Sequence, residues 1–227
     1  MEEQLIEYLC QFVNDDRLRL LYKNLENRTR YLTIVLEDIY QAQNASAVVR
    51  SADCFGIQDI HVIENRNTFD VDREVSMGAS KWVHLIHYNN EWNNTQMALS
   101  RLKNEGYRII ATSPHTDDVS LENFDLRKGK AALVFGTELT GISDVIKANA
   151  DEFLRIPMYG FTESFNISVS AAIIMHHLTW RMKNDPMIKW QLNNDERGTV
   201  LLHWLKKTIR ESELLEKNFY ELYGKRQ

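Results

Sequence analysis

Apolar residues recur along this chain in two kinds of pattern, and each kind predicts a different element. Near the start their spacing is helical and predicts a helical arm. The apolar positions are Leu5, Ile6, Leu9, Phe12, Val13, Leu18, Leu21 and Leu25. Short β-rich apolar runs follow and predict strands at residues 32–36, 60–63, 82–86, 108–111, 132–135 and 153–156. Because helix-like segments alternate with these runs, we expect an α/β fold with a mostly parallel sheet.

The last third of the chain returns to helical spacing. One apolar stripe follows the last predicted strand, at Ile167, Ala171, Ile174, Met175 and Leu178. A polar stretch around Asp185 and Pro186 ends it, and a second stripe then occurs at Leu201, Leu202, Leu205, Ile209 and Leu214. We therefore predict a helical arm at residues 1–30, an α/β domain at residues 31–184 and a helical extension at residues 185–227.

Composition narrows the class of protein. Of the 227 residues, 44% are hydrophobic, enough for a full core, and the cysteines are Cys10 and Cys54. No signal peptide opens the chain, and every apolar run is far shorter than the roughly 18 residues of a membrane span. We expect a soluble, cytoplasmic protein without membrane association.

The net charge of -5 argues against nucleic-acid binding, because Lys and Arg normally neutralise the phosphates. Local clusters of basic residues point the other way. We predict RNA contact at the two ends of the chain, by Arg17, Arg19, Arg28, Arg30, Lys206, Lys207 and Arg210. Ordinary solvated helix faces are an equally open interpretation of both clusters.

Residues suited to ligand contact follow three predicted strands. They are Thr112-Ser113, Gly136-Thr137-Glu138 and the segment from Pro157 to Gly160. Each alone could be an ordinary loop, but ligands of open α/β sheets bind at the carboxyl ends of strands. The chain lacks the G-x-G-x-x-G and Gly-Lys-Ser/Thr fingerprints of common nucleotide sites. His176 and His177 lack nearby cysteines or carboxylates, so we expect no metal.

Two further segments carry polar residues at predicted helix starts. The first contains Asn44 and Arg50, and we expect its helix to begin at Asn44 or Ser46. Arg50 lies about 200° around that helix from the apolar Val48, so it points away from the core, where a solvated arginine is the ordinary alternative. The second segment precedes the long apolar helix, for which Asn166 or Ser168 could serve as the N-cap.

Taken in order, three segments resemble the motifs of the SpoU (TrmH) family of RNA 2′-O-methyltransferases. They are residues 44–50, residues 133–143 and residues 156–170, and residues 78–83 look like a further piece of the TrmH branch. The resemblance covers roughly residues 32–181. It implies a SPOUT fold with a deep trefoil knot in its carboxyl-terminal part, S-adenosylmethionine as cofactor and a homodimer that completes the site. General topology rules favour no knot.

The resemblance also implies roles for individual residues. Arg50 activates the ribose hydroxyl, and the residues around it are Asn44, Glu138, Ser164 and Asn166. Because an arginine is almost never deprotonated, we expect Arg50 to stabilise the developing alkoxide instead. The residues expected to touch the cofactor are Thr112, Gly136, Ile156, Met158 and Phe165.

The first motif contains the sequence Asn-x-Ser, and helical extensions flank the α/β domain. In both respects the chain is similar to tRNA methyltransferases that act on a D-loop guanosine. The expected partner is therefore tRNA. Two positions depart from the family pattern, because relatives often carry His at Gln43, and Asn, Ala or Gln at Thr137. A methyltransferase of ribosomal RNA and a non-catalytic RNA-binding module stay open as alternatives.

Overall fold

The computed structural model describes residues 1–69, 72–90, 92–113, 119–137 and 140–223. They form two compact units, Met1–Arg28 with Gln191–Gln227, and Thr29–Trp190. The sequence predicted a separate arm and tail with boundaries at residues 30 and 184. Instead, both terminal segments belong to one helical unit, and the α/β unit extends to residue 190. Distant helices share this unit because each has an apolar stripe to cover.

Within the described residues, the α/β unit contains a seven-stranded sheet in which every neighbouring pair of strands is parallel. The strand order is β3-β2-β1-β6-β4-β7-β5. The strands are β1 (Leu32–Glu37), β2 (Asp59–Ile63), β3 (His84–Tyr88), β4 (Arg108–Thr112), β5 (Val119–Ser120), β6 (Ala131–Phe135) and β7 (Glu152–Arg155). The mostly parallel sheet is thus confirmed. The pattern missed β5, which is too short to show a periodicity.

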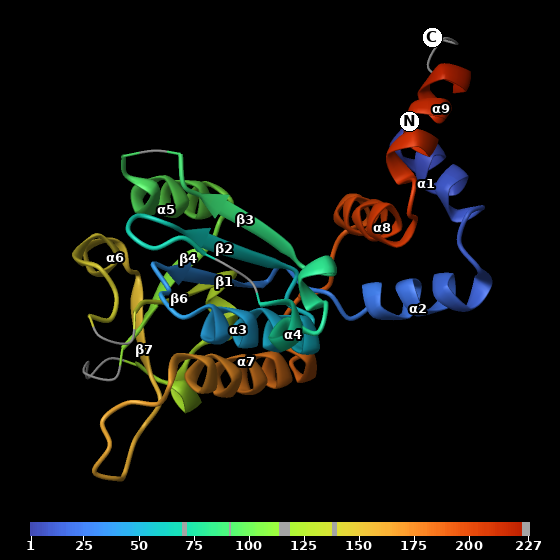
Figure 1. Ribbon diagram of the computed structural model, residues 1–227. Helices are drawn as coiled ribbons and strands as arrows, with labels where there is room; N and C mark the ends of the chain where they lie inside the picture. Colours follow the sequence, from blue (N-terminus) through green and yellow to red (C-terminus); the bar gives the residue numbers. More distant parts are fainter. Residues whose placement is uncertain (70–71, 91, 114–118, 138–139, 224–227) are drawn as a thin grey trace. The chain divides into compact units, whose positions relative to one another are not determined.

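Helices cover both faces of the sheet (Figure 1). On one face lie α3 (Ala42–Phe55), α4 (Arg73–Ser76) and α7 (Ile167–Asn184), and on the other lie α5 (Asn94–Asn104) and α6 (Asp144–Asn149). Ile34 packs in the same cluster as the α3 and α7 residues, whereas its neighbour Val35 packs with residues of α5 and α6. Successive side chains of a strand point to opposite faces, so β1 is buried on both. Short 3₁₀ turns complete the connections, η1 (Ala79–Lys81), η2 (Leu121–Asn123) and η3 (Leu126–Lys128).

The helical unit consists of α1 (Glu2–Cys10), α2 (Asp15–Leu25), α8 (Asn194–Thr208) and α9 (Ser212–Tyr223). The expected helical arm consists of two helices, and Asn14 caps the second by accepting a hydrogen bond from the Arg17 backbone N–H at 2.8 Å. Asn193 and Glu196 form a capping box at the start of α8. Helix α1 packs against both α8 and α9, so the two ends of the chain stabilise each other.

A buried histidine in the sheet makes stability depend on pH. His61 on β2 is 1% exposed, and its Nδ1 lies 2.8 Å from the Tyr88 hydroxyl. Burial lowers the pKa of His61 from 6.5 to about 4, although the Asp59 charge opposes this. Between these two pH values the unfolded chain binds a proton that the folded chain does not. Folding therefore loses stability as the pH falls through this window.

We expect the free energy of unfolding to fall by up to about 3 kcal/mol between pH 6.5 and pH 4 because of His61. Urea denaturation at several pH values measures this slope. His61→Gln keeps a polar side chain without a titrating group, so it should flatten most of the dependence. An identical slope in wild type and variant would assign the effect to other groups.

Candidate active site

Three loops at the carboxyl edge of the sheet enclose a pocket of about 620 Å³, which we call the β6 pocket. It lies at the ends of β4, β6 and β7. The five residues expected to touch a cofactor all line it, namely Thr112, Gly136, Ile156, Met158 and Phe165. Residues far apart in sequence, from 112 to 165, thus meet at one ligand-sized hollow. Their contact with a cofactor stays a prediction.

Gly136 permits two backbone segments to approach closely in this pocket. A Cβ at this position would lie 2.2 Å from the carbonyl oxygen of Gly141. Beside it, Thr137 and Gly141 exchange two backbone hydrogen bonds of 2.9 Å. The Thr137 hydroxyl also accepts a hydrogen bond from the Thr140 backbone N–H at 3.0 Å. The threonine that departs from the family pattern therefore helps to fold this turn.

Two asparagines meet at the edge of the β6 pocket. Nδ2 of Asn166 donates to Oδ1 of Asn44 at 3.1 Å, and we call these residues the asparagine pair. Asn166 is the N-cap of α7, as one of the two sequence-based alternatives predicted. Ser164 and Asn166 line the β6 pocket. The structure therefore brings three of the expected catalytic residues together.

The start of α3 differs from the prediction. The helix begins at Ala42 with Gln41 as its N-cap residue, not at Asn44 or Ser46. The Asn44 side chain donates to the Gln41 side chain at 2.9 Å, and the Ser46 hydroxyl donates to the Ala42 carbonyl at 2.7 Å. Both polar groups are satisfied inside the first turn. The sequence shows that Asn44 and Ser46 can cap a helix, but it does not show that their side chains bond to Gln41 and Ala42 instead.

Arg50 lies on the exposed side of α3, while Val48 and Ala52 are buried on the other side, as the helical geometry predicted. It lines neither of the two pockets described for this site. Within the described ranges, its guanidinium makes no hydrogen bond or ion pair. Glu138, the remaining expected catalytic residue, lies outside the described residues.

A second pocket, which sequence reasoning missed, adjoins the first. It has a volume of about 880 Å³ and lies at the ends of β1 and β2, so we call it the β1 pocket. Its floor includes Glu37, whose buried carboxylate accepts hydrogen bonds from the backbone N–H and hydroxyl of Ser143 and from the Thr95 hydroxyl, at 2.9, 2.7 and 2.7 Å. The acidic pair Glu37-Asp38, at the carboxyl end of a buried strand, was the signal that could have located this pocket.

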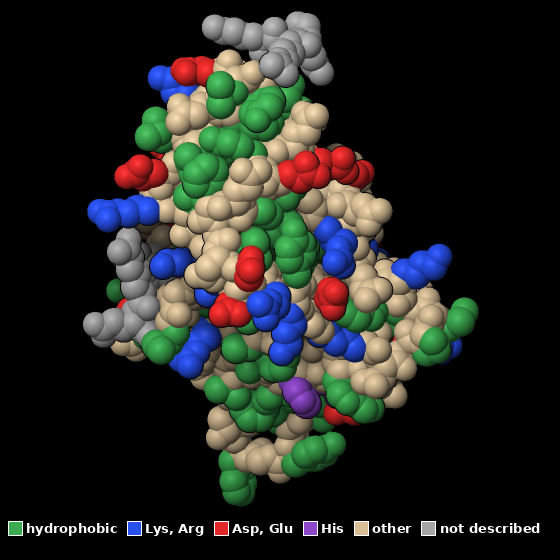
Figure 2. All heavy atoms as spheres, turned by 90° about the vertical axis from the view of Figure 1, so that its right-hand side faces the viewer, with side chains coloured by type: hydrophobic (Ala, Val, Ile, Leu, Met, Phe, Trp, Pro, Cys, Tyr) green, Lys and Arg blue, Asp and Glu red, His purple; other side chains and the backbone are tan. Residues whose placement is uncertain are grey.

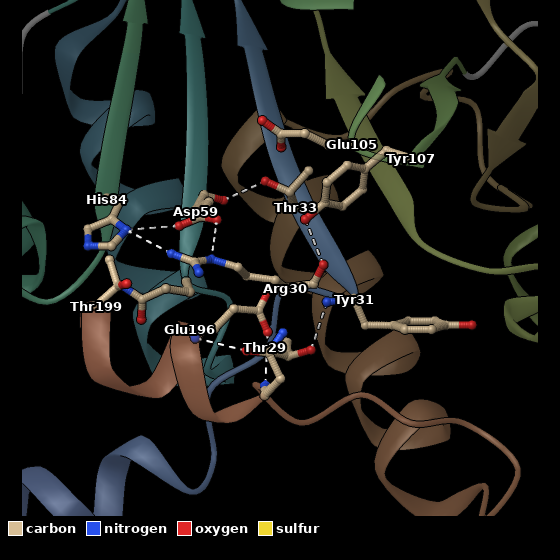
Figure 3. A network of polar contacts seen from close by, with 12 residues as sticks. Thr29, Arg30, Tyr31, Thr33, Asp59, His84, Glu105, Tyr107, Glu196 and Thr199 are labelled. Atoms are coloured by element: carbon tan, nitrogen blue, oxygen red, sulfur yellow. Dashed lines mark hydrogen bonds and ion pairs between the residues drawn. The ribbon is translucent and has the colours of Figure 1, made fainter. Parts of the chain in front are cut away.

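Arg30, which was expected to contact RNA, belongs to a polar network in the α/β unit (Figure 3). Its Nε donates to Asp59 at 2.8 Å, and His84 Nδ1 lies 3.1 Å from the same carboxylate. Burial alone would raise the pKa of Asp59, but hydrogen bonds from His84 and Arg30 and the Arg30 charge bring it below its usual value. The Arg30 side chain therefore has a structural partner.

The other basic residues that were expected to contact RNA differ in their surroundings. Arg28 is only 5% exposed, and its guanidinium carbon lies 5.1 Å from the centre of the Trp204 ring. Arg19 pairs with Asp16 at 3.5 Å, and Lys206 pairs with Glu216 at 2.6 Å. Lys207 and Arg210 are exposed, and Arg17 is partly exposed. Figure 2 shows Lys and Arg side chains interspersed with acidic ones on the face it displays.

The described part of the chain offers neither a cluster of metal ligands nor a membrane helix. No three His, Cys, Asp or Glu side chains within it are placed to hold a metal ion together. None of its helices combines the length and the apolar character that crossing a bilayer requires.

A parallel α/β sheet with pockets at its carboxyl edge defines the class of open α/β proteins, whose ligands bind at the carboxyl ends of strands. Comparison with known families gives a narrower result. Residues 31–176 match the model of the SpoU rRNA Methylase family. The chain belongs to this family, which confirms the expectation drawn from the three motifs.

Similar proteins extend over most of the chain. The tRNA (guanosine(18)-2'-O)-methyltransferase of Borreliella burgdorferi is 40% identical over 211 residues, covering 93% of this chain and 94% of that protein. The enzyme of the same name from Thermus thermophilus is 32% identical, covering 84% and 96%. A crystal structure of the A. aeolicus TrmH/SpoU tRNA modifying enzyme superposes with a TM-score of 0.75 at 28% identity, covering 87% of this chain and 98% of that one.

Proposed function

We propose that this protein transfers a methyl group from S-adenosylmethionine to the 2′-hydroxyl of a guanosine in the D-loop of tRNA. The observation that carries the proposal is the convergence of the three family motifs on the β6 pocket and the asparagine pair. Relatives named tRNA (guanosine(18)-2'-O)-methyltransferase match over 93% and 84% of the chain, which is more than the α/β unit alone. Because tRNA is the substrate, we place the protein in the cytoplasm.

The β6 pocket has the chemistry that S-adenosylmethionine requires. Apolar side chains of Ile156, Met158 and Phe165 supply walls for an adenine ring, and the loop at Gly136 offers backbone groups at close range. Gly136 and Gly141 approach so closely that no side chain intrudes there. When bound, the cofactor supplies an electrophilic methyl group on a sulfonium. The pocket fits this ligand, and these residues would hold it.

The residues of the chain then position and activate the ribose. In an in-line displacement the ribose oxygen would gain the methyl group that bound S-adenosylmethionine supplies, and the hydroxyl proton would leave to water. Asn44 and Asn166 orient the ribose at the edge of the pocket, and Ser164 lines the same side. Arg50 stabilises the developing alkoxide and binds the neighbouring phosphate. Glu138 stays a predicted partner of this arginine.

A homodimer completes the site in this proposal. Arg50 lines neither pocket of its own chain, so in this proposal the partner subunit's Arg50 reaches the ribose at the asparagine pair. Large apolar side chains are exposed beside the β6 pocket, namely Tyr159, Phe161 and Val169. Exposed apolar surface of this kind is typical of an interface. The trefoil knot that the family implies would lie in the same carboxyl-terminal loops.

We propose that RNA contacts the exposed cations of the terminal helices. Lys207 and Arg210 are the best residues to test, since reversing Arg28 or Arg30 would place a carboxylate in a buried or paired site. Lys207→Glu with Arg210→Glu should weaken tRNA binding and lower its salt dependence by roughly 0.9 slope units for every phosphate that is no longer neutralised. Filter binding over a series of salt concentrations measures both effects.

Lys103→Glu is the matched control for this charge reversal, because Lys103 is an exposed lysine on α5. It should leave the affinity and its salt dependence as in wild type. Equal tRNA affinity for the double variant and wild type would remove these residues from the RNA surface. Cofactor affinity should be the same in all three proteins.

The proposed reaction is tested directly with purified protein, labelled S-adenosylmethionine and unmodified RNA transcripts. We expect label in tRNA, mapped to one D-loop ribose, and none in ribosomal RNA fragments. Label in ribosomal RNA alone would favour the other substrate of the same chemistry. Calorimetry that detects no cofactor binding would indicate a non-catalytic RNA-binding module.

A further inference from the structure

The β1 pocket and the β6 pocket form adjoining compartments. The residues that line both pockets are Thr137, Thr140, Gly141, Ile142, Lys147 and Ile167. The asparagine pair connects them as well, because Asn44 lines the β1 pocket and Asn166 lines the β6 pocket. A group bound in the β1 pocket therefore lies next to a cofactor in the β6 pocket.

The inner wall of the β1 pocket is held by hydrogen bonds before any ligand arrives. Asp38 has a left-handed backbone with φ of 52°, an unusual conformation that aspartate tolerates better than most residues. Its Oδ1 accepts hydrogen bonds from the backbone N–H groups of Asn65 and Arg66 at 2.7 and 2.8 Å. Nδ2 of Asn67 donates to the Asp38 carbonyl at 2.8 Å. The turn that carries Arg66 is thus fixed in place.

The rim of the β1 pocket carries two uncovered aromatic side chains. Trp92 is fully exposed and Tyr40 is 81% exposed, and both line the pocket. Large exposed aromatic rings provide stacking surfaces for unpaired bases, since every base has a π-face. Tyr40 follows β1 and Trp92 precedes α5, so two separate loops each contribute an aromatic ring to the pocket.

Polar groups suited to the edge of a base complete the lining. Arg66 is exposed, and in the described part of the chain its guanidinium has no carboxylate partner. Asn65 and Asn67 add amide groups, and Glu37 and Asp38 make the pocket unfavourable for a bare phosphate. Arginine pairs most specifically with O6 and N7 of guanine, whereas asparagine oxygens accept from amino and imino groups.

We propose that the β1 pocket binds the base of the nucleotide that is methylated, a guanine, with Trp92 as stacking surface and Arg66 at its O6 edge. The inference rests on the proposed methyltransferase function and adds the site that selects the base. Extruding a nucleotide from structured RNA into such a pocket costs stacking energy that these contacts offset. The ribose then lies at the asparagine pair, between the base and the cofactor.

Steady-state methylation of a tRNA transcript tests the stacking contact. Trp92→Ala should raise KM for tRNA about tenfold with little change in the affinity for S-adenosylmethionine. Met187→Ala removes another exposed apolar side chain, outside both pockets, and should behave as wild type. Since Trp92 is fully exposed, its replacement should leave the fold intact, which circular dichroism checks.

A substrate change tests the edge contact of Arg66 independently. Replacing the target guanosine by 2-aminopurine riboside removes O6 and should lower kcat/KM of the wild type about tenfold. Arg66→Ala should lower kcat/KM for guanosine by the same factor and show no further decrease with 2-aminopurine. Lys103→Ala changes an exposed cation outside the pocket. Its kcat/KM should still decrease about tenfold when 2-aminopurine riboside replaces the target guanosine.

The outcomes separate this inference from the proposed function. If wild type methylates tRNA and Trp92→Ala has the same KM as wild type, the base pocket alone is overturned. The same conclusion follows if the decreases in kcat/KM caused by Arg66→Ala and by 2-aminopurine multiply when the two changes are combined. A wild-type protein that methylates no RNA overturns both. A raised KM together with an Arg66 effect that disappears on removal of O6 supports the pocket as the guanine site.

Discussion

Replacing Arg50 by alanine should reduce methyl transfer by about 10²–10³-fold while the affinity for S-adenosylmethionine stays close to that of wild type. The reason is the position of Arg50 on the exposed side of α3, away from the lining of the β6 pocket. Its removal takes away the charge that stabilises the ribose alkoxide and leaves the cofactor walls unchanged. Single-turnover methylation and calorimetry, on the same preparation, measure the two quantities.

Lys is the informative second substitution at position 50. Arg50→Lys keeps the charge but loses the planar guanidinium, so it should recover only part of the rate if two oxygens are bound at once. Wild-type turnover by Arg50→Ala would contradict the assignment of this arginine to the reaction. Loss of cofactor binding in this variant would place Arg50 in the cofactor site instead.

Mixing variants tests whether Arg50 acts across a dimer. In a random mixture of Arg50→Ala and Gly136→Val subunits, half of the dimers are mixed, and one of their two sites would have both an intact pocket and an arginine from the other subunit. Activity should therefore return to about a quarter of wild type. No recovery from folded, exchanging subunits would show that Arg50 serves its own chain.

Gly136→Val should abolish measurable cofactor binding and lower the free energy of unfolding by about 1–3 kcal/mol. A valine side chain at this position would occupy space that the cofactor needs. The structure shows a nearer obstacle, because the added Cβ would lie 2.2 Å from the Gly141 carbonyl oxygen. The loop must open, and the paired hydrogen bonds between Thr137 and Gly141 then break. Calorimetry and urea denaturation measure these effects.

Gly198→Ala is the matched control for this glycine. Gly198 lies on α8, outside both pockets, and the nearest atom to an added Cβ is Oε1 of Glu2 at 3.7 Å, an ordinary contact. This variant should bind cofactor as wild type does and should be no less stable. Cofactor affinity unchanged by Gly136→Val would show that the loop adapts and that close approach of Gly141 is dispensable.

Much of the fold could be predicted from local pattern. The six predicted strands occur within two residues of their expected positions, and Asn166 does cap α7. The outward direction of Arg50 followed from helical geometry alone. Local sequence determines all of these features. Capping involves residues close in sequence, and periodicity shows which side of a helix or strand faces the core.

The sites at the chain ends show why other features could not be predicted. Arg28 and Arg30 look like free cations in sequence, yet one packs on Trp204 and the other pairs with Asp59. Each partner lies far along the chain, and charge patterning does not report which cations will be enclosed. The same applies to the helical ends, which form one unit although the whole of Thr29–Trp190 lies between them in the sequence.

The sequence by itself determined the alternating α/β architecture, the helical ends and the three motifs that mark the β6 pocket. Only the tertiary structure decided how those motifs are completed. It placed Asn44 against Asn166, left Arg50 outside both pockets and assembled the β1 pocket from loops around residues 38, 66, 92 and 143. Such contacts depend on the order in which parallel strands lie in the sheet, and strand order is a property of the whole chain that no local pattern encodes.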